Sequence, residues 1–348
     1  MALIAHQRPS PPQDLDARVY ALSPGNVAFL RELGVWQALP QDRLAPVHGM
    51  QIYGDGAGSL AFDAYAAGVP ELAWIVEDSV LQHGLWQGLD VPIFASQTKA
   101  LAIEAAHVRL HLSDDARLSA KLVVGADGAN SFVRRQAGIA ASESDYGQTA
   151  VVANFACEKP HANVAYQWFQ RGAVLALLPL PGQRVSMVWS LPTSAAKTIS
   201  ETVCGEVETA TRGLLGKLEL VTAPRSYPLR RLSAQRMVAP RIALAGDAGH
   251  VIHPLAGQGL NLGLQDARAL AEVLNGREPG RDPGELRLLR RYERRRAEPI
   301  LAMDTMVDSL FRLFGAESRL AAQWRNAGLN LTDRLPVVKN ILMRQAMT

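Results

Sequence analysis

The pattern of apolar and polar positions predicts short strands alternating with amphipathic helices at both ends of the chain. Residues 2–5 form an apolar run of strand length, and a proline-rich loop follows them. Apolar residues recur at helical spacing in 26–39, where Ser23 and Pro24 provide a start signal, and again in 77–89. We therefore expect a short buried strand followed by two helices.

Residues 50–65 contain two strand-length segments around a glycine-rich turn. Gly54, Gly56 and Gly58 resemble a phosphate-binding loop, but such a loop must lead from a strand into a helix so that free N–H groups point at the anion. A second strand follows here instead. The turn is therefore predicted to be a hairpin.

The middle of the chain, from about 150 to 227, is rich in strands and has one inserted helix. A hairpin and a buried strand are predicted before it at 108–127, with an apolar strand at 241–247 and a helix at 260–274 after it. From Pro283 onward the pattern is helical. Strands alternating with helices at both ends predict an α/β protein in which a parallel-sheet domain is interrupted by a mixed-sheet domain.

Composition is that of a folded protein from a reducing compartment. Of the 348 residues, 48% are hydrophobic and 20% are charged, and the mean hydropathy is +0.00. Cys157 and Cys204 are too few and too isolated for a disulfide framework or a zinc site. No apolar run reaches the roughly 18 residues of a membrane span, and the first apolar stretch is too short for a secretory signal. We therefore expect a cytoplasmic protein.

Arginines are concentrated near the start of the C-terminal helical part, and helical spacing places several of them on one face. A solvated face is the favoured interpretation, and contact with anionic lipid or with an acidic partner protein stays open. Nucleic acid is disfavoured because no aromatic residues alternate with the arginines. The cluster consists of Arg287, Arg290, Arg291, Arg294, Arg295 and Arg296. An amphipathic set of side chains follows at Met303, Met306, Leu310, Phe311 and Phe314. Core or dimer packing is the favoured interpretation of this set, and a membrane-leaning surface is the alternative.

Two turns follow apolar strands, and the carboxyl ends of parallel strands are where open sheets bind ligands. The first contains Asp127 and Gly128, which by themselves are typical of a plain turn. Ser131 and the pair Arg134-Arg135 follow at the start of a predicted helix. Their N–H groups, hydroxyl and guanidinium could converge on a phosphate.

The second turn begins at Gly246-Asp247 and continues through Pro254, Gly257 and Gly259 into the helix that starts near Leu260. The two later glycines let backbone N–H groups approach a flat or anionic ligand closely. The positive end of the helix dipole adds to this attraction. The arrangement favours a ligand that becomes negative, as reduced flavin does.

Two other kinds of site are disfavoured in this region. Asp247, His250 and His253 are candidate metal ligands, but the histidines precede the predicted helix and no further ligand stands at suitable spacing. A serine hydrolase is disfavoured because the chain lacks a Gly-x-Ser-x-Gly elbow.

The chain resembles the flavin-dependent aromatic hydroxylases and, within them, the ubiquinone-biosynthesis hydroxylases. Segments that carry the resemblance span nearly the whole chain, at 16–39, 74–89, 122–139, 227–270 and 325–348. The resemblance implies a doubly wound, Rossmann-like FAD-binding domain of the glutathione-reductase type, interrupted by a mixed β-sheet substrate domain. The implied FAD-binding domain comprises 1–48, 73–148 and 228–280, the substrate domain 49–72 and 149–227, and a C-terminal helical region 281–348.

The resemblance also implies a set of cofactor contacts. Arg18 and Gln82 would contact the FAD diphosphate and nearby groups, and Asp127 and Gly128 would belong to a motif shared by flavin and NAD(P)H binding. Asp247, which follows Gly246, would hold the ribityl chain and diphosphate side. The isoalloxazine ring would lie along the segment from Pro254 to Asn261, which includes Gly257, Gly259 and Leu260. No catalytic acid or base is nominated, and no metal is expected.

The implied activity is hydroxylation of the aromatic ring of a polyprenylated phenol or quinol intermediate of ubiquinone biosynthesis. NAD(P)H would reduce the flavin, and O2 would enter the reaction through a C4a-hydroperoxide. The expected partners are this hydrophobic substrate, with peripheral contact to the inner membrane and a quinone-biosynthesis complex or homo-oligomer as further expectations. The alternative is a flavin-free truncated homologue that acts as a scaffold for such a complex.

The sequence departs from the family at its start. The family begins with a strand, Gly-x-Gly-x-x-Gly and a helix, whereas Met1 opens into what resembles the second strand, and no acidic residue ends that strand. A start codon placed too far downstream and a shortened protein are favoured over a replacement of the strand by other means. In a doubly wound sheet the first strand lies in the middle. We therefore expect two unpaired strand edges and flavin affinity below that of an intact relative.

Overall fold

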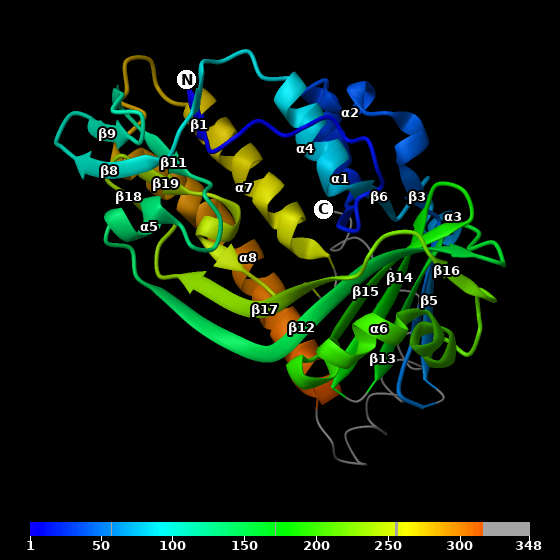
Figure 1. Cartoon of the computed structure of the whole chain (residues 1–348). Helices are drawn as coiled ribbons and strands as arrows, with labels where there is room; N and C mark the ends of the chain where they lie inside the picture. The colour runs from blue at the N-terminus through cyan, green and yellow to red at the C-terminus, as the bar shows by residue number, and fades with distance from the viewer. Residues whose placement is uncertain (57, 171, 255–256, 316–348) are drawn as a thin grey trace. The chain divides into compact units, whose positions relative to one another are not determined.

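The computed structural model describes residues 1–56, 58–170, 172–254 and 257–315, and the chain divides into two compact units (Figure 1). The first unit comprises Met1–Pro9, Leu89–Tyr146 and Arg230–Val307. The second comprises Ser10–Gly88, Gly147–Leu229 and the chain from Asp308 onward. Units defined by contact need not coincide with domains defined by ligand, so the division into FAD-binding and substrate domains stays a prediction.

The first unit contains small sheets and the helices that pack on them. Its strands are β1 (Leu3–Ala5), β7 (Ile93–Ala95), β8 (Thr98–Ile103), β9 (Val108–Leu112), β10 (Arg117–Ala120), β11 (Val123–Gly125), β18 (Val238–Ala239), β19 (Ile242–Leu244) and β20 (His250–Val251). Its helical elements are α5 (Phe132–Gln136), the 3₁₀ turn η2 (Gly246–Ala248), α7 (Gln258–Asn275) and α8 (Leu286–Gly315), the last of which continues past the unit boundary. Strands β12 (Ala141–Cys157) and β17 (Arg225–Ala234) each run from one unit into the other.

The parallel strands of this unit lie in two separate sheets. β1 pairs in parallel with β7, and β11 pairs in parallel with β19. Within the described residues, β1 and β11 each have one hydrogen-bonded strand neighbour. Val124 in the middle of β11 is 43% exposed, whereas strands of a doubly wound sheet are buried on both faces. The expectation of two open strand edges is therefore confirmed.

Strand β19 lies in the core of the first unit. Ile242, Ala243 and Leu244 are fully buried, and the buried Tyr292 of α8 donates its hydroxyl to the carbonyl of Leu244 at 2.7 Å. This bond satisfies the hydroxyl that burial would otherwise leave unpaired. At the end of the neighbouring strand, a Cβ on Gly125 would lie 2.9 Å from the Cβ of Val133, so only glycine lets α5 pack this closely.

The second unit is built on the large mixed sheet. Its strands, besides parts of β12 and β17, are β2 (Val19–Leu22), β3 (Ala45–Val47), β4 (Gly49–Tyr53), β5 (Ser59–Asp63), β6 (Ala73–Glu77), β13 (Val164–Gln170), β14 (Ala173–Leu180), β15 (Arg184–Pro192) and β16 (Leu218–Leu220). Its helices are α1 (Pro24–Glu32), α2 (Val35–Ala38), η1 (Gln41–Arg43), α3 (Ala64–Ala67), α4 (Asp78–Gln87) and α6 (Thr193–Ala210). The large sheet has the order β20-β17-β12-β15-β14-β13-β4-β5 with β16 beside β12, and a smaller sheet has the order β2-β6-β3.

Helix α6 covers one face of the large sheet. Its Val203 and Val207 are buried in a cluster with Phe155, Leu175 and Met187 of the sheet. These side chains alternate with residues that point to the opposite face, as the period of two along a strand requires. The hairpin predicted around residues 54–58 is confirmed, because β4 and β5 pair antiparallel on either side of it.

Three details of the predicted elements are corrected. The helix predicted over 26–39 is two helices, because Gly34 adopts a left-handed φ of +73° between α1 and α2. Helix α7 starts at Gln258, two residues before the predicted start at Leu260. Strand β1 is half-buried rather than buried.

The C-terminal helical region is observed in α8, and residues 325–348, part of the family resemblance, lie outside the described residues. In the part of the chain that the structure describes, no helix is both long and apolar enough to span a bilayer. The α/β fold with a mixed sheet and a C-terminal helix is as predicted.

Candidate flavin site

The turn after β19 presents a carboxylate at the carboxyl end of a parallel strand. Gly246 adopts a left-handed φ of +58°, and its amide donates to Oδ2 of Asp266 at 2.9 Å. The next residue, Asp247, is exposed, while Ala248 is fully buried. The chain therefore places Asp247, the predicted cofactor ligand, at the surface and returns to the core at Ala248.

The start of α7 is the second part of this site. Gly257 has a φ of +62°, and no side chain among the described residues caps the helix N-terminus. The first amides of a helix have no intrahelical acceptor, and together with the dipole they attract negative charge. Outside its own helical turn, a Cβ built on Gly259 would meet no atom of the described residues within 4 Å, so they leave space beside this backbone. Open space beside amides without a side-chain cap fits a flat ring that gains negative charge on reduction.

The two parts pack directly on each other within the first unit. A Cβ on Gly263 of α7 would lie 3.4 Å from the Cα of Gly246. The side chain of the buried Asn261 donates to the carbonyl of Gly257 at 3.3 Å. Pro254 and Leu260 are partly buried beside these residues. The structure therefore brings together the predicted residues from Gly246 to Asn261, apart from 255–256, which lie outside the described residues.

A buried ionic network holds the Gly246 turn in place. The carboxylate of Asp266 in α7 accepts from the amide of Gly246, lies 2.6 Å from Nε2 of His250, and accepts from Nε of Arg296 in α8 at 2.6 Å. Asp266 is 0% exposed, and its two side-chain partners are 4% and 5% exposed. Charge-assisted hydrogen bonds of this kind are strong and directional. We infer that Asp266 positions the turn that displays Asp247.

This buried ionic network was not predicted from the sequence, although the sequence contains a signal for it. Asp266 stands at the helical spacing of the buried residues Leu262, Leu270 and Val273. A carboxylate on the buried face of an amphipathic helix is unusual unless it is paired. The pattern therefore indicates a buried partner, which the structure identifies as Arg296 from the arginine-rich segment.

The candidate metal trio is not a metal site in this structure. His250 contacts Asp266, and His253 lies edge-on to the ring of Tyr146 with the centroids 4.8 Å apart. Burial lowers the pKa of His253 to about 4, so its ring is neutral at physiological pH. Among the described residues, no three His, Cys, Asp or Glu side chains are grouped in a way that could hold a metal ion.

The Asp127-Gly128 turn does not have the phosphate-binding geometry that the sequence suggests. Oδ2 of Asp127 accepts from the amides of Phe132 and Val133 at 2.7 and 3.1 Å, and Oδ1 accepts from the hydroxyl of Ser131 at 2.5 Å. The carboxylate therefore uses the helix-start groups that a phosphate would need. The hypothesis that they converge on a phosphate is wrong, because Asp127 is itself the anion at the start of α5.

Arg134 also has a role other than the one expected. Its side chain is buried, and it donates to the carbonyls of Ala248 and Ala129 at 2.8 and 2.9 Å. The first carbonyl belongs to the residue after Asp247, and the second belongs to the residue after Gly128. Arg134 therefore ties the two predicted motifs together inside the first unit.

Arg18 and Gln82, the predicted diphosphate contacts, lie together in the second unit. Gln82 Nε2 donates to Oδ1 of Asp78 at 2.8 Å, and Arg18 Nη1 lies 3.8 Å from Oδ2 of the same carboxylate. The Arg18 guanidinium carbon lies 5.3 Å from the ring centroid of Tyr20 and 5.8 Å from that of Tyr227. Its side chain is 48% exposed, so the cation is held in position at the surface.

A buried pair supports the Arg18 loop from behind. Glu77, which is 1% exposed, accepts two bonds of 2.7 Å from Arg43 and one of 2.6 Å from the amide of Asp16. The hydrogen bonds to Glu77 raise the pKa of Arg43, which stays fully charged. Asp16 in turn accepts from the amides of Arg18 and Ser79 at 3.0 and 3.2 Å. Sequence reasoning missed this pair because its partners are separated along the chain.

Comparison with known proteins defines the class. A family model described as FAD binding domain matches residues 17–305, which is most of the chain. The p-nitrophenol 4-monooxygenase PnpA of Pseudomonas putida DLL-E4 has a similar fold, with a TM-score of 0.78 and 17% identity over 99% of this chain and 91% of PnpA. HpxO of Klebsiella pneumoniae, solved with FAD and uric acid, gives a TM-score of 0.76 at 16% identity over 99% and 96% of the two chains. The fold is that of FAD-dependent monooxygenases.

Sequence relatives narrow the class. The 3-demethoxyubiquinol 3-hydroxylase of Escherichia coli K12 is 32% identical over 363 aligned positions, covering 100% of this chain and 92% of the relative. Ubiquinone hydroxylase UbiL of Rhodospirillum rubrum is 33% identical, covering 95% of this chain and 80% of UbiL. The chain therefore belongs to the ubiquinone-hydroxylase family of FAD-dependent aromatic monooxygenases. The resemblance is confirmed, and the flavin-free scaffold gains no support.

Proposed function

We propose that this chain hydroxylates the aromatic ring of a polyprenylated phenol or quinol in ubiquinone biosynthesis. The names of the relatives support this substrate class, since one is a 3-demethoxyubiquinol 3-hydroxylase and another is a ubiquinone hydroxylase. The observation that carries the proposal is the open, uncapped start of α7 packed against the turn that displays Asp247. FAD bound there supplies redox chemistry with NAD(P)H and O2.

The residues of this chain bind and orient the cofactor. The α7 amides around Gly259 stabilise negative charge on the ring, and Asp247 accepts hydrogen bonds from ribityl hydroxyls. Arg18, with Gln82 beside it, provides the cation for the diphosphate. Asp127 orders the α5 start, from which Arg134 reaches the carbonyl behind the Asp247 turn.

Activity in cells tests the proposal directly. The gene is expressed in an E. coli strain that lacks its 3-demethoxyubiquinol 3-hydroxylase, and extracted quinones are separated by chromatography with mass detection. We expect demethoxyubiquinone to be replaced by ubiquinone. The Asp247→Ala variant, expressed at the same level, should leave the precursor unchanged. Accumulated precursor with the wild-type chain, at normal protein and FAD levels, would contradict demethoxyubiquinol as a substrate of this chain.

We also propose peripheral contact with an anionic membrane, through three arginines of α8. Arg291, Arg295 and Arg296 pair with Glu278, Glu272 and Asp266. The other three, Arg287, Arg290 and Arg294, are exposed and have no ion pair within the described residues. At about 100° per residue they lie within about 60° of one another. We call them the α8 arginine stripe.

The surroundings of the stripe favour a lipid surface over an acidic protein. Leu301, two helical turns after Arg294, is 66% exposed, so an apolar side chain extends the same side of the helix. Glu298 is the acidic side chain on this side. Each cation near an anionic bilayer contributes about 1 kcal/mol, so three give about 3 kcal/mol, or roughly a 100-fold change in partitioning.

Vesicle binding tests the stripe. The protein is sedimented with vesicles of phosphatidylcholine alone or with added phosphatidylglycerol, using the wild type and a variant with the three stripe arginines changed to Gln. The control variant changes three exposed cations elsewhere, Arg117, Lys197 and Arg225, to Gln. We expect only the stripe variant to lose binding to the anionic vesicles. Equal losses in both variants would show a general charge effect.

Assembly into a homo-oligomer or a quinone-biosynthesis complex is a further proposal, and light scattering tests the former.

A further inference from the structure

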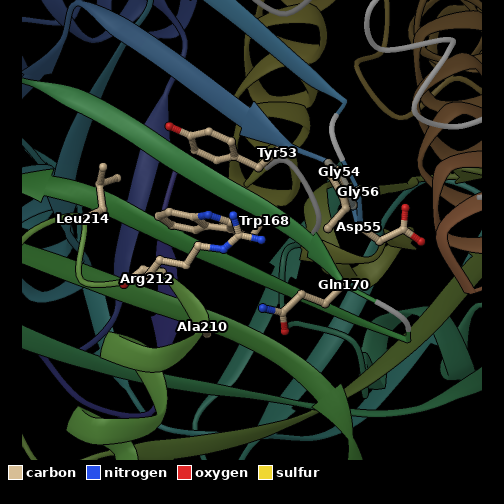
Figure 2. A pocket seen from close by; sticks show the side chains of 11 residues that line it. Tyr53, Gly54, Asp55, Gly56, Trp168, Gln170, Ala210, Arg212 and Leu214 are labelled. Atoms are coloured by element: carbon tan, nitrogen blue, oxygen red, sulfur yellow. The ribbon is translucent and has the colours of Figure 1, made fainter.

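A cavity of about 460 Å³ opens in the second unit, and none of the residues that line it is predicted to bind the cofactor (Figure 2). The β4–β5 turn at Gly54–Gly56 forms one side of it, and the segment after α6 from Ala210 to Leu214 forms another. Small-molecule sites span about 300–1,000 Å³. The cavity is therefore large enough for a ligand of more than one ring.

One wall of the cavity is aromatic. Tyr53 and Trp168 are partners in the β4–β13 ladder, and their rings are stacked with centroids 5.4 Å apart and planes 16° from parallel. The ring of Tyr166, two residues before Trp168 on β13, lies with its centroid 6.0 Å from that of Trp168 and its plane 25° from parallel. Trp168 and Tyr166 pack against the α6 face of the sheet. The wall thus offers a fixed flat surface on which a planar ring can stack.

The segment after α6 brings a cation to this wall. Arg212 lines the cavity, is exposed, and has no acidic partner within the described residues. It adopts a left-handed φ of +53°, a conformation that is unfavourable for a side chain other than glycine. The amide bonds of Arg212 to Thr209 and of Gly213 to Glu208 fix this turn. The strained turn therefore holds Arg212 among the residues that line the cavity, together with Tyr53 and Trp168 (Figure 2).

Polar groups complete the lining. Asp55 lies on the β4–β5 turn and Gln170 lies at the end of β13. A carboxylate and a carboxamide accept hydrogen bonds from an exocyclic amino group, and glutamine matches the edge of adenine in a bidentate manner. A ring surface, a cation and an amino-recognising edge are the three features that a purine nucleotide requires.

From this geometry we propose that the cavity binds a nucleoside monophosphate. The base stacks on Trp168, its amino group faces Asp55 and Gln170, and the phosphate pairs with Arg212. None of its lining residues belongs to the candidate flavin site, and the proposal is independent of the proposed hydroxylation, because it concerns binding by the second unit alone.

Direct binding of AMP tests the proposal. The protein is labelled with 5-fluorotryptophan, which reports its six tryptophans, and the Trp168 fluorine resonance is assigned with Trp168→Phe. We expect AMP to shift this resonance, and adenosine and ribose 5-phosphate to bind at least about tenfold more weakly. The shift must persist with saturating FAD, whose own AMP moiety competes only at the flavin site. Displacement by FAD, or a shift confined to other tryptophans, would overturn the proposal.

Two variants distinguish the loss of the Arg212 charge from a loss of folding. Arg212→Gly removes the guanidinium and suits the left-handed backbone, so folding is retained. It should weaken AMP about tenfold or more and leave adenosine binding unchanged. Arg225→Gln, an exposed cation of the same unit outside the cavity, is the control and should change neither. If AMP affinity is the same in Arg212→Gly and the wild type, or if benzoate-type carboxylates bind as well as AMP, the nucleotide assignment fails.

Discussion

Replacing Asp266 with asparagine tests how the candidate flavin site is held together. The side chain keeps its size but loses the charge that faces Arg296 and His250. An amide has one acceptor oxygen. If that oxygen meets Arg296, the NH2 group faces the amide of Gly246, where two donors oppose each other.

The magnitude follows from burial. Breaking a buried ion pair by removing one partner costs about 3–5 kcal/mol, because the remaining charge is buried without compensation. Both Asp266 and Arg296 are nearly inaccessible, so solvent does not reduce this cost. A loss of this size is a large part of the roughly 5–15 kcal/mol that stabilises a typical domain.

Urea unfolding, followed by near-ultraviolet circular dichroism, measures the change in the free energy of unfolding. The control is Glu272→Gln in the same helix, which removes two exposed pairs, with Arg268 and Arg295, each worth less than about 1 kcal/mol. We expect Asp266→Asn to lose about 3–5 kcal/mol and to bind FAD at least about tenfold more weakly. If the two variants were equally stable and bound FAD equally, the positioning role of Asp266 would be refuted.

The remaining predictions concern four other places in the molecule. The folded pKa of His253, about 4, lies below its ordinary value of 6.5. The stabilisation that the neutral ring contributes to the free energy of unfolding is therefore fully present above pH 6.5 and is lost as the pH drops toward 4. His253→Gln should remove about 2 kcal/mol of the difference in unfolding free energy between pH 7 and pH 5, and an unchanged difference would contradict this. Arg18→Gln should weaken FAD about tenfold and leave riboflavin, which lacks a diphosphate, unaffected in a fluorescence titration; equal effects on both flavins would argue against a diphosphate contact. Gly259→Leu should keep the thermal midpoint, since its side chain enters open space, yet abolish flavin binding, and retained binding would place the ring elsewhere. Adding before β1 a strand, Gly-x-Gly-x-x-Gly and helix, the unit with which the resembled family begins, should join the β1–β7 and β11–β19 pairs and tighten FAD at least about tenfold; no gain would show that the open edges do not limit affinity.

Much of the fold could be predicted because its signals are local. The β4–β5 hairpin and the β14–β15 pair follow from alternation around glycine turns, and α4 and α7 follow from helical spacing. The break at Gly34 could not, because apolar spacing continues across it and the left-handed turn depends on one residue.

The candidate site divides in the same way. Asp247 and the glycines before α7 are contiguous and were predicted, whereas Asp266, His250 and Arg296 meet only when α7 and α8 pack together. The Asp127 turn was misinterpreted because a helix start attracts a phosphate and a carboxylate for the same electrostatic reason. In the folded chain, the carboxylate of Asp127 itself accepts the hydrogen bonds that the first α5 amides donate.

Glycine amides provide the most direct test of the flavin site. Protein labelled with 15N-glycine is titrated with FAD while flavin absorbance reports binding, and the resonances of Gly246, Gly257 and Gly259 are assigned with single alanine variants. We predict that Gly257 and Gly259 shift in proportion to bound flavin, while Gly34 in the second unit stays unchanged. Saturated flavin binding with unshifted α7 glycines would contradict the account.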